Sequence, residues 1–324
     1  MNKIKILFPL FLLLATYTSI GCAKTTSRHN TIASTHQAAK EIVVKTKDAQ
    51  LFCRVFGQGD PILIIHGGPG LSQDYLLPQM TELAKNNLLI FYDQRGCGHS
   101  TGEITSDTMQ LQTFVNDLET IRQFFKYDQV TVLGHSWGAF LAMNYAIAYP
   151  KGVHKLILLN AHPPSFEEYG LFEQEIMKRL NPCLDEFIAV RESPEFAQGD
   201  PIALKKYCKI LFEKYFYHPA NAQLLNLSFD PETSKNGSKV SELFTQNLFL
   251  KPHNIHDQLK QLKVPTLIIH GDSDPIPLSI AQRLHEDIKG SQYFLLKHCG
   301  HFPYVETPDE FFQHLNAFLR QDGR

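Results

Sequence analysis

The sequence predicts an α/β fold: a mostly parallel eight-stranded sheet with a helical segment inserted after the sixth strand. From residue 41 onward, short continuous apolar runs alternate with segments of helical periodicity, as in strands buried on both faces of a sheet. The alternation stops once, over residues 162–255, which are rich in charged and aromatic side chains. We therefore expect residues 41–161 and 256–324 to form the core, and residues 162–255 to form a helical cap above the strand ends.

Eight apolar runs give the expected strands, and three periodic segments give the clearest helices. The expected strands are 41–46, 51–56, 61–65, 88–92, 130–133, 155–159, 266–269 and 292–296. The expected helices are 111–125, 137–148 and 308–319. The last should begin with a capping box at Thr307 and with Pro308 in its first turn.

The amino terminus has the pattern of an export signal. Lys3 and Lys5 precede an uncharged, mostly apolar run that is shorter than the ~20 residues of a membrane-spanning helix. The run ends in SIGC, which resembles a bacterial lipoprotein box with Cys22 as the lipidated residue. Ordinary cleavage near Ala23, or an uncleaved anchor, are the alternatives.

These features predict an exported protein, either a lipoprotein anchored in a bacterial membrane or a periplasmic or secreted one. Residues 1–22 would be the signal peptide, and the polar residues 23–40 would be a flexible tether. The membrane would be contacted only through the lipid anchor.

The charge and cysteine content argue against a nucleic-acid-binding protein and against a fold held together by disulfides. The formal net charge is −2 and no long basic stretch occurs, which argues against a nucleic-acid partner. Without Cys22, five of the six cysteines remain, so a complete disulfide framework is impossible. In an exported protein, Cys183 and Cys208 are the pair to test.

The nucleophile is predicted from the pentapeptide GHSWG, residues 134–138, at a strand-to-helix junction. In a G-x-S-x-G turn the serine hydroxyl is exposed at the top of the sheet, and the glycines permit close helix–strand approach. A serine needs a base to take its proton and a carboxylate to orient that base. We therefore expect Ser136 to be the nucleophile of a serine hydrolase.

The base and its carboxylate are expected after late strands, the order found in α/β-hydrolases. The strand 266–269 leads into HGDSDP, where Asp274 is favoured over Asp272. The last strand leads into HCGHF, where His301 is favoured over His298. A metal site in this loop is disfavoured because consecutive loop residues rarely converge on one ion, so no metal or other cofactor is expected.

The motif HGGPG at residues 66–70 follows the third strand. It matches neither a phosphate-binding nor a dinucleotide-binding glycine loop. Its position is that of an oxyanion loop, so Gly68, with Gly67 as the alternative, is expected to donate one backbone N–H. The second donor would be the N–H of Trp137, directly after the nucleophile.

Taken together, HGGPG (66–70), DQRGCGHS (93–100), GHSWG (134–138), GDSDP (271–275) and GHF (300–302) resemble the proline iminopeptidase family of α/β-hydrolases over residues 41–320. The resemblance implies removal of N-terminal residues, often proline, from peptides. His135 stands where prolyl enzymes often carry glycine, so acyl transfer is implied more firmly than proline preference. Asp93 and Arg95 are expected to brace the oxyanion loop.

An aminopeptidase must recognise a free amine, and a carboxylate in the cap would supply its partner. Glu242 resembles the position of such a glutamate in some family members. The leading hypothesis is a serine aminopeptidase acting on small peptides through an acyl-enzyme. An esterase, amidase or carbon–carbon bond hydrolase, acting on a small acyl substrate, is the alternative, and a non-catalytic ligand-binding protein is a more remote one.

Overall fold

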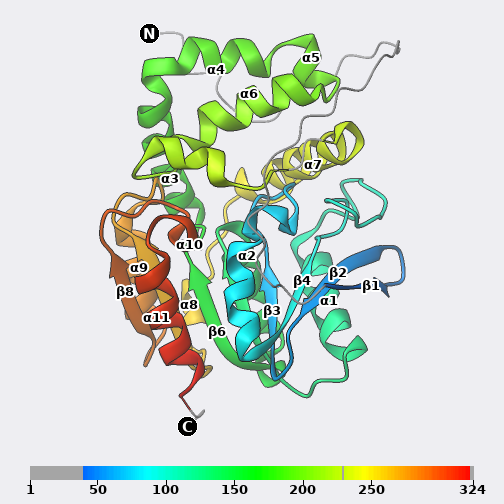
Figure 1. Cartoon of the computed structure of the whole chain (residues 1–324), viewed down its shortest axis with the longest axis vertical. Coiled ribbons are helices and arrows are strands. Elements are labelled where there is room, and N and C mark those ends of the chain that lie inside the picture. Colours follow the sequence, from blue (N-terminus) through cyan, green and yellow to red (C-terminus); the bar gives the residue numbers. More distant parts are fainter. Residues whose placement is uncertain (1–38, 228–229, 322–324) are drawn as a thin grey trace.

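The computed structural model describes residues 39–227 and 230–321, which form one eight-stranded sheet, helices on both of its faces and a helical cap (Figure 1). The strand order is β1-β2-β4-β3-β5-β6-β7-β8. The pairs β1·β2 and β2·β4 are antiparallel and the other five pairs are parallel, which confirms the predicted fold class. The strands are β1 (Lys40–Lys45), β2 (Gln50–Phe56), β3 (Asp60–Ile65), β4 (Asn87–Tyr92), β5 (Val130–His135), β6 (Val153–Leu159), β7 (Thr266–Gly271) and β8 (Gln292–Leu296).

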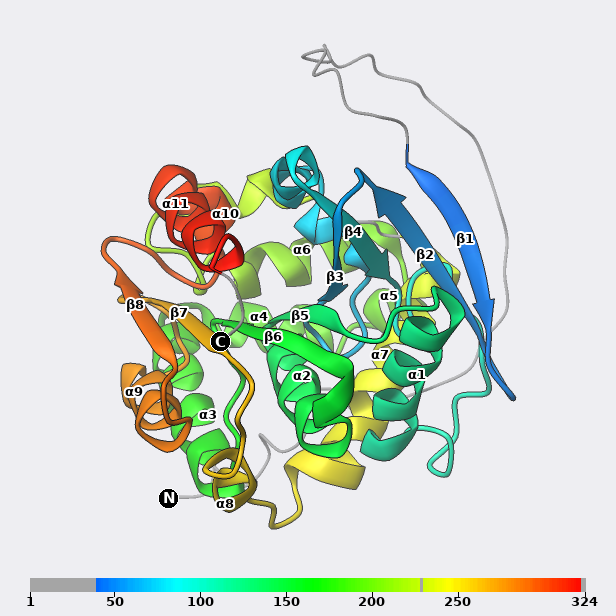
Figure 2. The ribbon, with the colours of Figure 1, turned by 90° about the horizontal axis from the view of Figure 1, so that it is seen from below.

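Helices cover both faces of the sheet, which explains why the central strands are continuous apolar runs. In Figure 2, α1, α2 and α9 lie on one side of the sheet and α11 lies on the other. Helix α2 directly follows β5 and is buried almost all round, as its uninterrupted apolar sequence predicts. The core helices are α1 (Leu111–Phe124), α2 (Trp137–Ala148), α8 (His256–Leu259), α9 (Leu278–Asp287), α10 (Pro303–Glu306) and α11 (Pro308–Leu319), with the short helices η2 (Gln73–Leu76), η3 (Gln79–Lys85) and η4 (Pro150–Gly152).

The cap is the part of the chain between β6 and β7, and we use the name for residues 162–255. It lies above the sheet in Figure 1, at the end where the parallel strands finish. Ile176, Phe187 and Tyr207 belong to a hydrophobic cluster confined to the cap, so its upper helices have a small core of their own. Its elements are α3 (Phe166–Leu180), η5 (Asn181–Cys183), α4 (Leu184–Arg191), α5 (Pro194–Ala197), α6 (Pro201–Phe212), η6 (Pro219–Leu224), α7 (Pro231–Phe244) and the π-helical η7 (Thr245–Phe249).

The predicted capping box is wrong: the Thr307 hydroxyl donates to the Pro303 carbonyl and the Cys299 sulfur instead of capping α11. Cys183 and Cys208 are both free. The proposed signal peptide and Cys22 lie outside the described residues, as does most of the expected tether, whose last residue, Lys40, begins β1.

Candidate active site

Ser136 lies in the sharp turn between β5 and α2. Its backbone has φ 57° and ψ −124°, a strained conformation for a residue with a side chain. The two flanking glycines are required by space. A Cβ on Gly134 would lie 2.2 Å from the Gly138 carbonyl oxygen, and one on Gly138 would lie 2.2 Å from the Ile65 carbonyl oxygen. The pentapeptide therefore forms the tight turn that its sequence predicts.

His301 and Asp274 meet at the carboxyl ends of β8 and β7. The Nδ1 atom of His301 lies 3.0 and 2.9 Å from the two carboxylate oxygens of Asp274. The carboxylate also accepts hydrogen bonds from the Asn160 side-chain amide at 2.6 Å and from the Ile276 backbone N–H at 2.8 Å. Burial acts to raise the pKa of Asp274, but the charge and hydrogen bond of His301 outweigh it and lower the pKa to about 2. Asp274 is therefore ionised at neutral pH.

Asp272 and His298, the alternatives to Asp274 and His301 in the same two loops, make other contacts. Asp272 accepts hydrogen bonds from the Ser273 hydroxyl and the Cys299 N–H, and its side chain is partly exposed. His298 is exposed and packs against the ring of Tyr217. The structure thus brings Asp274, and not Asp272, into contact with His301. In the part of the chain that is described, no group of three or more His, Cys, Asp or Glu is placed to hold a metal ion.

Ser136 and His301 line the same cavity. Since Asp274 contacts Nδ1 of His301, the Nε2 atom is the one left to act as a base. Among the interactions of the described residues, no hydrogen bond joins the Ser136 hydroxyl to His301. Contacts of this kind often tighten only when substrate binds.

The two glycines of the predicted oxyanion loop differ in what their N–H groups do. The Gly67 N–H donates to the Tyr75 hydroxyl at 2.5 Å and is therefore occupied. The N–H groups of Gly68 and Trp137 have no hydrogen-bond partner among the described residues. Gly67 and Gly68 both line the cavity beside Ser136. This difference favours Gly68 over Gly67 as the donor.

Tyr75 and His135 form a buried chain that the sequence did not reveal. The Tyr75 hydroxyl lies 2.7 Å from His135 Nδ1, and His135 Nε2 lies 2.8 Å from the His301 carbonyl oxygen. Burial and the nearby His301 lower the pKa of His135 to about 3, so its ring is neutral. A carbonyl only accepts, so Nε2 carries the proton and Nδ1 accepts from Tyr75. The chain thus runs from the Gly67 N–H through Tyr75 and His135 to His301.

Gln94 links the oxyanion loop to the helix that follows the nucleophile. Its side-chain amide donates to the His66 carbonyl at 2.7 Å, and its oxygen accepts from the Trp137 indole at 2.9 Å. The Gln94 N–H in turn donates to His66 Nε2 at 3.0 Å. Both donor segments are therefore held by one buried amide side chain.

Asp93 and Arg95, on either side of Gln94, make structural contacts. The Asp93 carboxylate accepts backbone N–H groups of Gln73 at 2.9 Å and His99 at 2.8 Å. Arg95 is almost fully buried and donates two hydrogen bonds of 2.7 Å to Asp117. These contacts fix the loop that carries Gln94.

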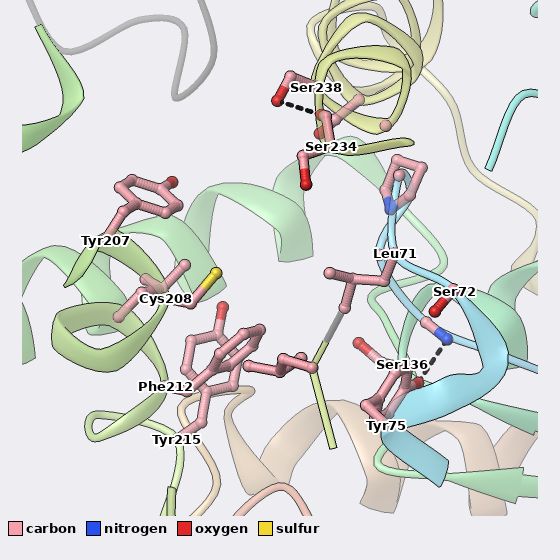
Figure 3. A pocket seen from close by; sticks show the side chains of 18 of the residues that line it. Leu71, Ser72, Tyr75, Ser136, Tyr207, Cys208, Phe212, Tyr215, Ser234 and Ser238 are labelled. Atoms are coloured by element: carbon pink, nitrogen blue, oxygen red, sulfur yellow. Dashed lines mark hydrogen bonds between the residues drawn. The ribbon is translucent and has the colours of Figure 1, made fainter. Parts of the chain in front are cut away.

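The cavity above Ser136 has a volume of about 520 Å³ and extends into the cap, between α3, α6 and α7. Figure 3 shows Ser136 and Tyr75 on one side of it, facing Tyr207 and Cys208 of α6 on the other. Glu242, predicted to bind the substrate amine, does not line this cavity; it accepts a hydrogen bond from exposed Gln246. The prediction for Glu242 is therefore wrong.

The cap contacts the histidine loop at several polar points. The Tyr215 carbonyl accepts the His301 N–H at 2.7 Å, and the Tyr215 ring packs on the His301 ring. Glu306 accepts N–H groups from Gly300 at 2.7 Å and from Tyr217 and His218 of the cap at 3.1 and 3.0 Å. The cap thus helps to position the loop that carries His301.

The chain is similar to known proteins in both sequence and structure. A family model described as "alpha/beta hydrolase fold" matches residues 60–308. A proline iminopeptidase of Lactobacillus delbrueckii subsp. lactis is 30% identical over 295 residues, covering 83% of this chain and 94% of the relative. A crystal structure of a proline iminopeptidase of Mycobacterium smegmatis matches with a TM-score of 0.65 at 21% identity, over 87% of this chain and 98% of that one. An esterase structure from Exiguobacterium antarcticum matches with a TM-score of 0.64 at 25% identity, over 86% of this chain and 98% of that one.

The same comparisons overturn the expected location. We expected an exported lipoprotein or a periplasmic or secreted protein. The proline iminopeptidase homologues, archaeal ones among them, are typically cytosolic, and they contradict that expectation. Within the described ranges, no helix is both long enough and apolar enough to cross a membrane.

Proposed function

The chain belongs to the proline iminopeptidase family of α/β-hydrolases, and from that premise we propose a serine aminopeptidase whose catalytic residues are Ser136, His301 and Asp274. The observation that carries the assignment of residues is their convergence. The strained Ser136, the His301 that is paired with a carboxylate, and Gly68 all line one cavity, and the N–H groups of Gly68 and Trp137 have no hydrogen-bond partner among the described residues. The substrate is a small peptide.

The reaction follows from this arrangement. Nε2 of His301 takes the hydroxyl proton as Ser136 Oγ attacks the carbonyl carbon of the N-terminal residue. The N–H groups of Gly68 and Trp137 stabilise the negative oxygen, each contributing a few kcal/mol to transition-state stabilisation. His301 then protonates the leaving amine, and the C–N bond breaks to leave an ester on Ser136. Water, deprotonated by His301, attacks that ester and releases the free amino acid.

The substrate amine needs an anionic partner, and the carboxylates that line the cavity differ in their availability. Asp74 is paired with Arg54, and Asp230 accepts the N–H groups of Glu232 and Thr233 at the start of α7. Glu173 of α3 has no ion-pair partner among the described residues.

Glu173 is therefore the residue we assign to the amine. Burial raises the pKa of Glu173, and its interaction with the Tyr169 hydroxyl only partly opposes that effect. A bound ammonium group would supply the missing counter-charge of this half-buried carboxylate. Glu173 would thus take the role that the sequence suggested for Glu242.

The amine assignment is tested with Glu173→Gln on an alanyl arylamide and on a neutral acyl ester. We expect KM for the arylamide to rise about tenfold or more while KM for the ester stays within about twofold, since only the arylamide carries the charge. Glu167→Gln, at an exposed position of the same helix, is the matched control. Equal changes for both substrates would exclude Glu173 from amine binding.

Ester hydrolysis is the second candidate, because most of the cavity lining in the cap is apolar and would suit an uncharged acyl group. The deciding experiment measures prolyl, alanyl and leucyl arylamides and short acyl esters, with Ser136→Ala as the control. Cleavage of esters without any cleavage of arylamides would contradict the aminopeptidase. Activity that survives Ser136→Ala would contradict the mechanism.

A further inference from the structure

The cavity above Ser136 is far larger than one prolyl ring requires, and more than half of the residues that line it belong to the cap. An apolar cavity of roughly 150 Å³ accommodates a benzene ring. The cavity here, at about 520 Å³, therefore has room for more than one ring beyond the reaction centre. We call its upper part, between α3, α6 and α7, the cap compartment.

The walls of the cap compartment are chemically different. One wall, on α3 and α6, is lined mainly by large apolar and aromatic side chains and also carries Glu173, the residue assigned to the substrate amine. The apolar side chains include Phe172, Ile176, Tyr207, Leu211 and Phe212. The opposite wall, on α7, presents small residues at helical spacing: Ser234, Gly237, Ser238, Ser241 and, at its end, Thr245. Small side chains on one helix therefore create the space, and large apolar ones on the other helices line it.

The hydroxyl groups of the α7 wall are partly occupied by their own helix. Ser238 donates to the Ser234 carbonyl at 2.9 Å, and Thr245 donates to the Ser241 carbonyl at 2.9 Å. Figure 3 shows the Ser238 bond and, across the cavity, the side chains of Cys208 and Phe212. Because these two hydroxyl protons are already donated within the helix, Ser238 and Thr245 do not need a polar ligand as a hydrogen-bond partner.

The position of α7 relative to the reaction centre is set by backbone contact. A Cβ on Gly237 would lie 2.0 Å from the carbonyl oxygen of Gly70, in the oxyanion loop, and one on Gly70 would lie 2.2 Å from the Gly237 carbonyl oxygen. The helix cannot approach the loop this closely with any other residue at these positions. The depth of the compartment measured from Ser136 is therefore fixed by the fold.

We propose that the cap compartment binds a large apolar acyl group, so that the enzyme prefers N-terminal residues with long aliphatic or aromatic side chains over proline. The proposal rests on the proposed function: because Glu173 of the cap binds the substrate amine there, the N-terminal residue of the substrate lies toward the cap. Each methylene that enters the compartment should raise kcat/KM about fourfold until the space is filled, because it removes apolar surface from water.

The first experiment measures kcat/KM for glycyl, alanyl, norvalyl, norleucyl, phenylalanyl and prolyl p-nitroanilides. We expect a rise along the aliphatic series, with the phenylalanyl substrate at least tenfold better than the prolyl one. A prolyl or alanyl substrate that equals or exceeds the phenylalanyl one would overturn the compartment while leaving the aminopeptidase intact.

The second experiment fills the compartment from one wall. Cys208→Trp should lower kcat/KM for the norleucyl and phenylalanyl substrates at least tenfold and leave the alanyl substrate within about threefold. Ile202→Trp adds the same ring to α6 at a position that is 80% exposed, and should change nothing. If Cys208→Trp does not fold, Ser238→Leu provides the same test, because it fills the compartment from α7. Equal losses for small and large substrates would overturn the proposal.

A third series separates this proposal from the aminopeptidase assignment. The same variants are assayed with p-nitrophenyl acetate, butyrate, octanoate and decanoate. Suppose that arylamides are not cleaved, but ester rates rise with chain length and fall in Cys208→Trp. This result would support binding of the acyl group in the cap compartment and would contradict aminopeptidase activity. If neither series is hydrolysed, both fall.

Discussion

The core side of the cavity is held by hydrogen bonds between buried polar groups, whereas its cap side is formed by apolar packing and small side chains. On the core side, Tyr75, Gln94, His135 and Asn160 each bond to a segment that carries a catalytic group. On the cap side of the compartment, the bonds of Ser238 and Thr245 stay within their own helix. The groups that we assign to catalysis are thus placed by directional bonds, whereas the proposed acyl site depends on the shape of the cavity.

The difference separates two properties of the enzyme. A hydrogen-bonded chain has one satisfied arrangement, so a lost member leaves buried partners unpaired and shifts the groups it held. An apolar wall loses or gains contact area in proportion to the change in volume. Substitutions on the core side should therefore change the rate for every substrate, and those on the cap side should change which substrates are preferred.

The strongest test on the core side is Asp274→Asn. The amide cannot stabilise a protonated His301, so kcat should fall by about 10⁴, the size found when a triad aspartate is made an amide in a serine protease. Asp272→Asn, two residues away, is the control and should keep kcat within about twofold, measured with the same arylamide. A small loss in Asp274→Asn would mean that another group orients His301.

The next test is Tyr75→Phe, which removes the hydroxyl between Gly67 and His135. We expect kcat to fall about 10- to 100-fold with little change in KM, because the loss acts on the oxyanion loop and the histidine. Tyr92→Phe is the control, since the Tyr92 hydroxyl has no hydrogen-bond partner among the described residues.

A double variant shows whether Tyr75 acts through His135. If both belong to one chain, adding His135→Leu to Tyr75→Phe should cost less than the sum of the two separate losses. Additive losses, or a loss confined to KM, would contradict the chain.

His162 is the first residue of the cap. Its substitution is expected to change how the free energy of unfolding depends on pH, and this test therefore measures stability and not the reaction rate. Burial lowers the pKa of His162 to about 3 from an ordinary value of 6.5. Between those values the unfolded chain binds a proton that the folded one does not. The stabilisation present above pH 6.5 is therefore lost as the pH falls, by about 1.4 kcal/mol per pH unit.

The variant for this test is His162→Phe, which keeps a ring between Tyr169 and Phe249 but does not titrate. Urea unfolding at pH 7.5, 6.5 and 5.5 should show a shallower acid loss for this variant than for the unsubstituted protein. His154→Gln, at an exposed strand position, should follow the unsubstituted protein. Parallel curves for all three proteins would show that His162 is not the source.

The smallest effect is expected on the cap side, for Ser238→Ala. Its hydroxyl proton is already donated to the Ser234 carbonyl, so removing it should leave kcat/KM for every arylamide within about threefold. Ser241→Ala, at the next turn of the same wall, is the matched comparison. A loss of tenfold or more in Ser238→Ala would show that this wall makes a polar contact with substrate.

The same contrast explains what could be predicted from the sequence. All eight strands were expected close to their observed positions, because apolar runs bounded by turns report buried strands directly. Ser136, Asp274 and His301 could be proposed from the sequence because each follows a strand in a short motif, and the carboxyl ends of parallel strands meet at one edge. Asn160 directly follows β6 in the same way, so its place in the sequence was a reason to expect it near Asp274.

The cap could not be predicted to the same depth. Glu242 is adjacent to Ser241, which lines the cavity, and successive residues on a helix point about 100° apart. The face that α7 turns inward is decided by the contact between Gly237 and Gly70, more than 160 residues apart in the sequence. Local sequence patterns carry no information about that contact, so they could not show that Glu173 lines the cavity and that Glu242 does not.

Glu306 has a consequence for how such an enzyme can acquire new substrates. Its carboxylate joins the loop that carries His301 to Tyr217 and His218 of the cap. Recombination that replaces the whole cap would break these bonds and shift the general base along with the specificity. Single replacements on α7 leave them untouched. Substrate range should therefore change by stepwise substitution on one helix more readily than by exchange of whole caps.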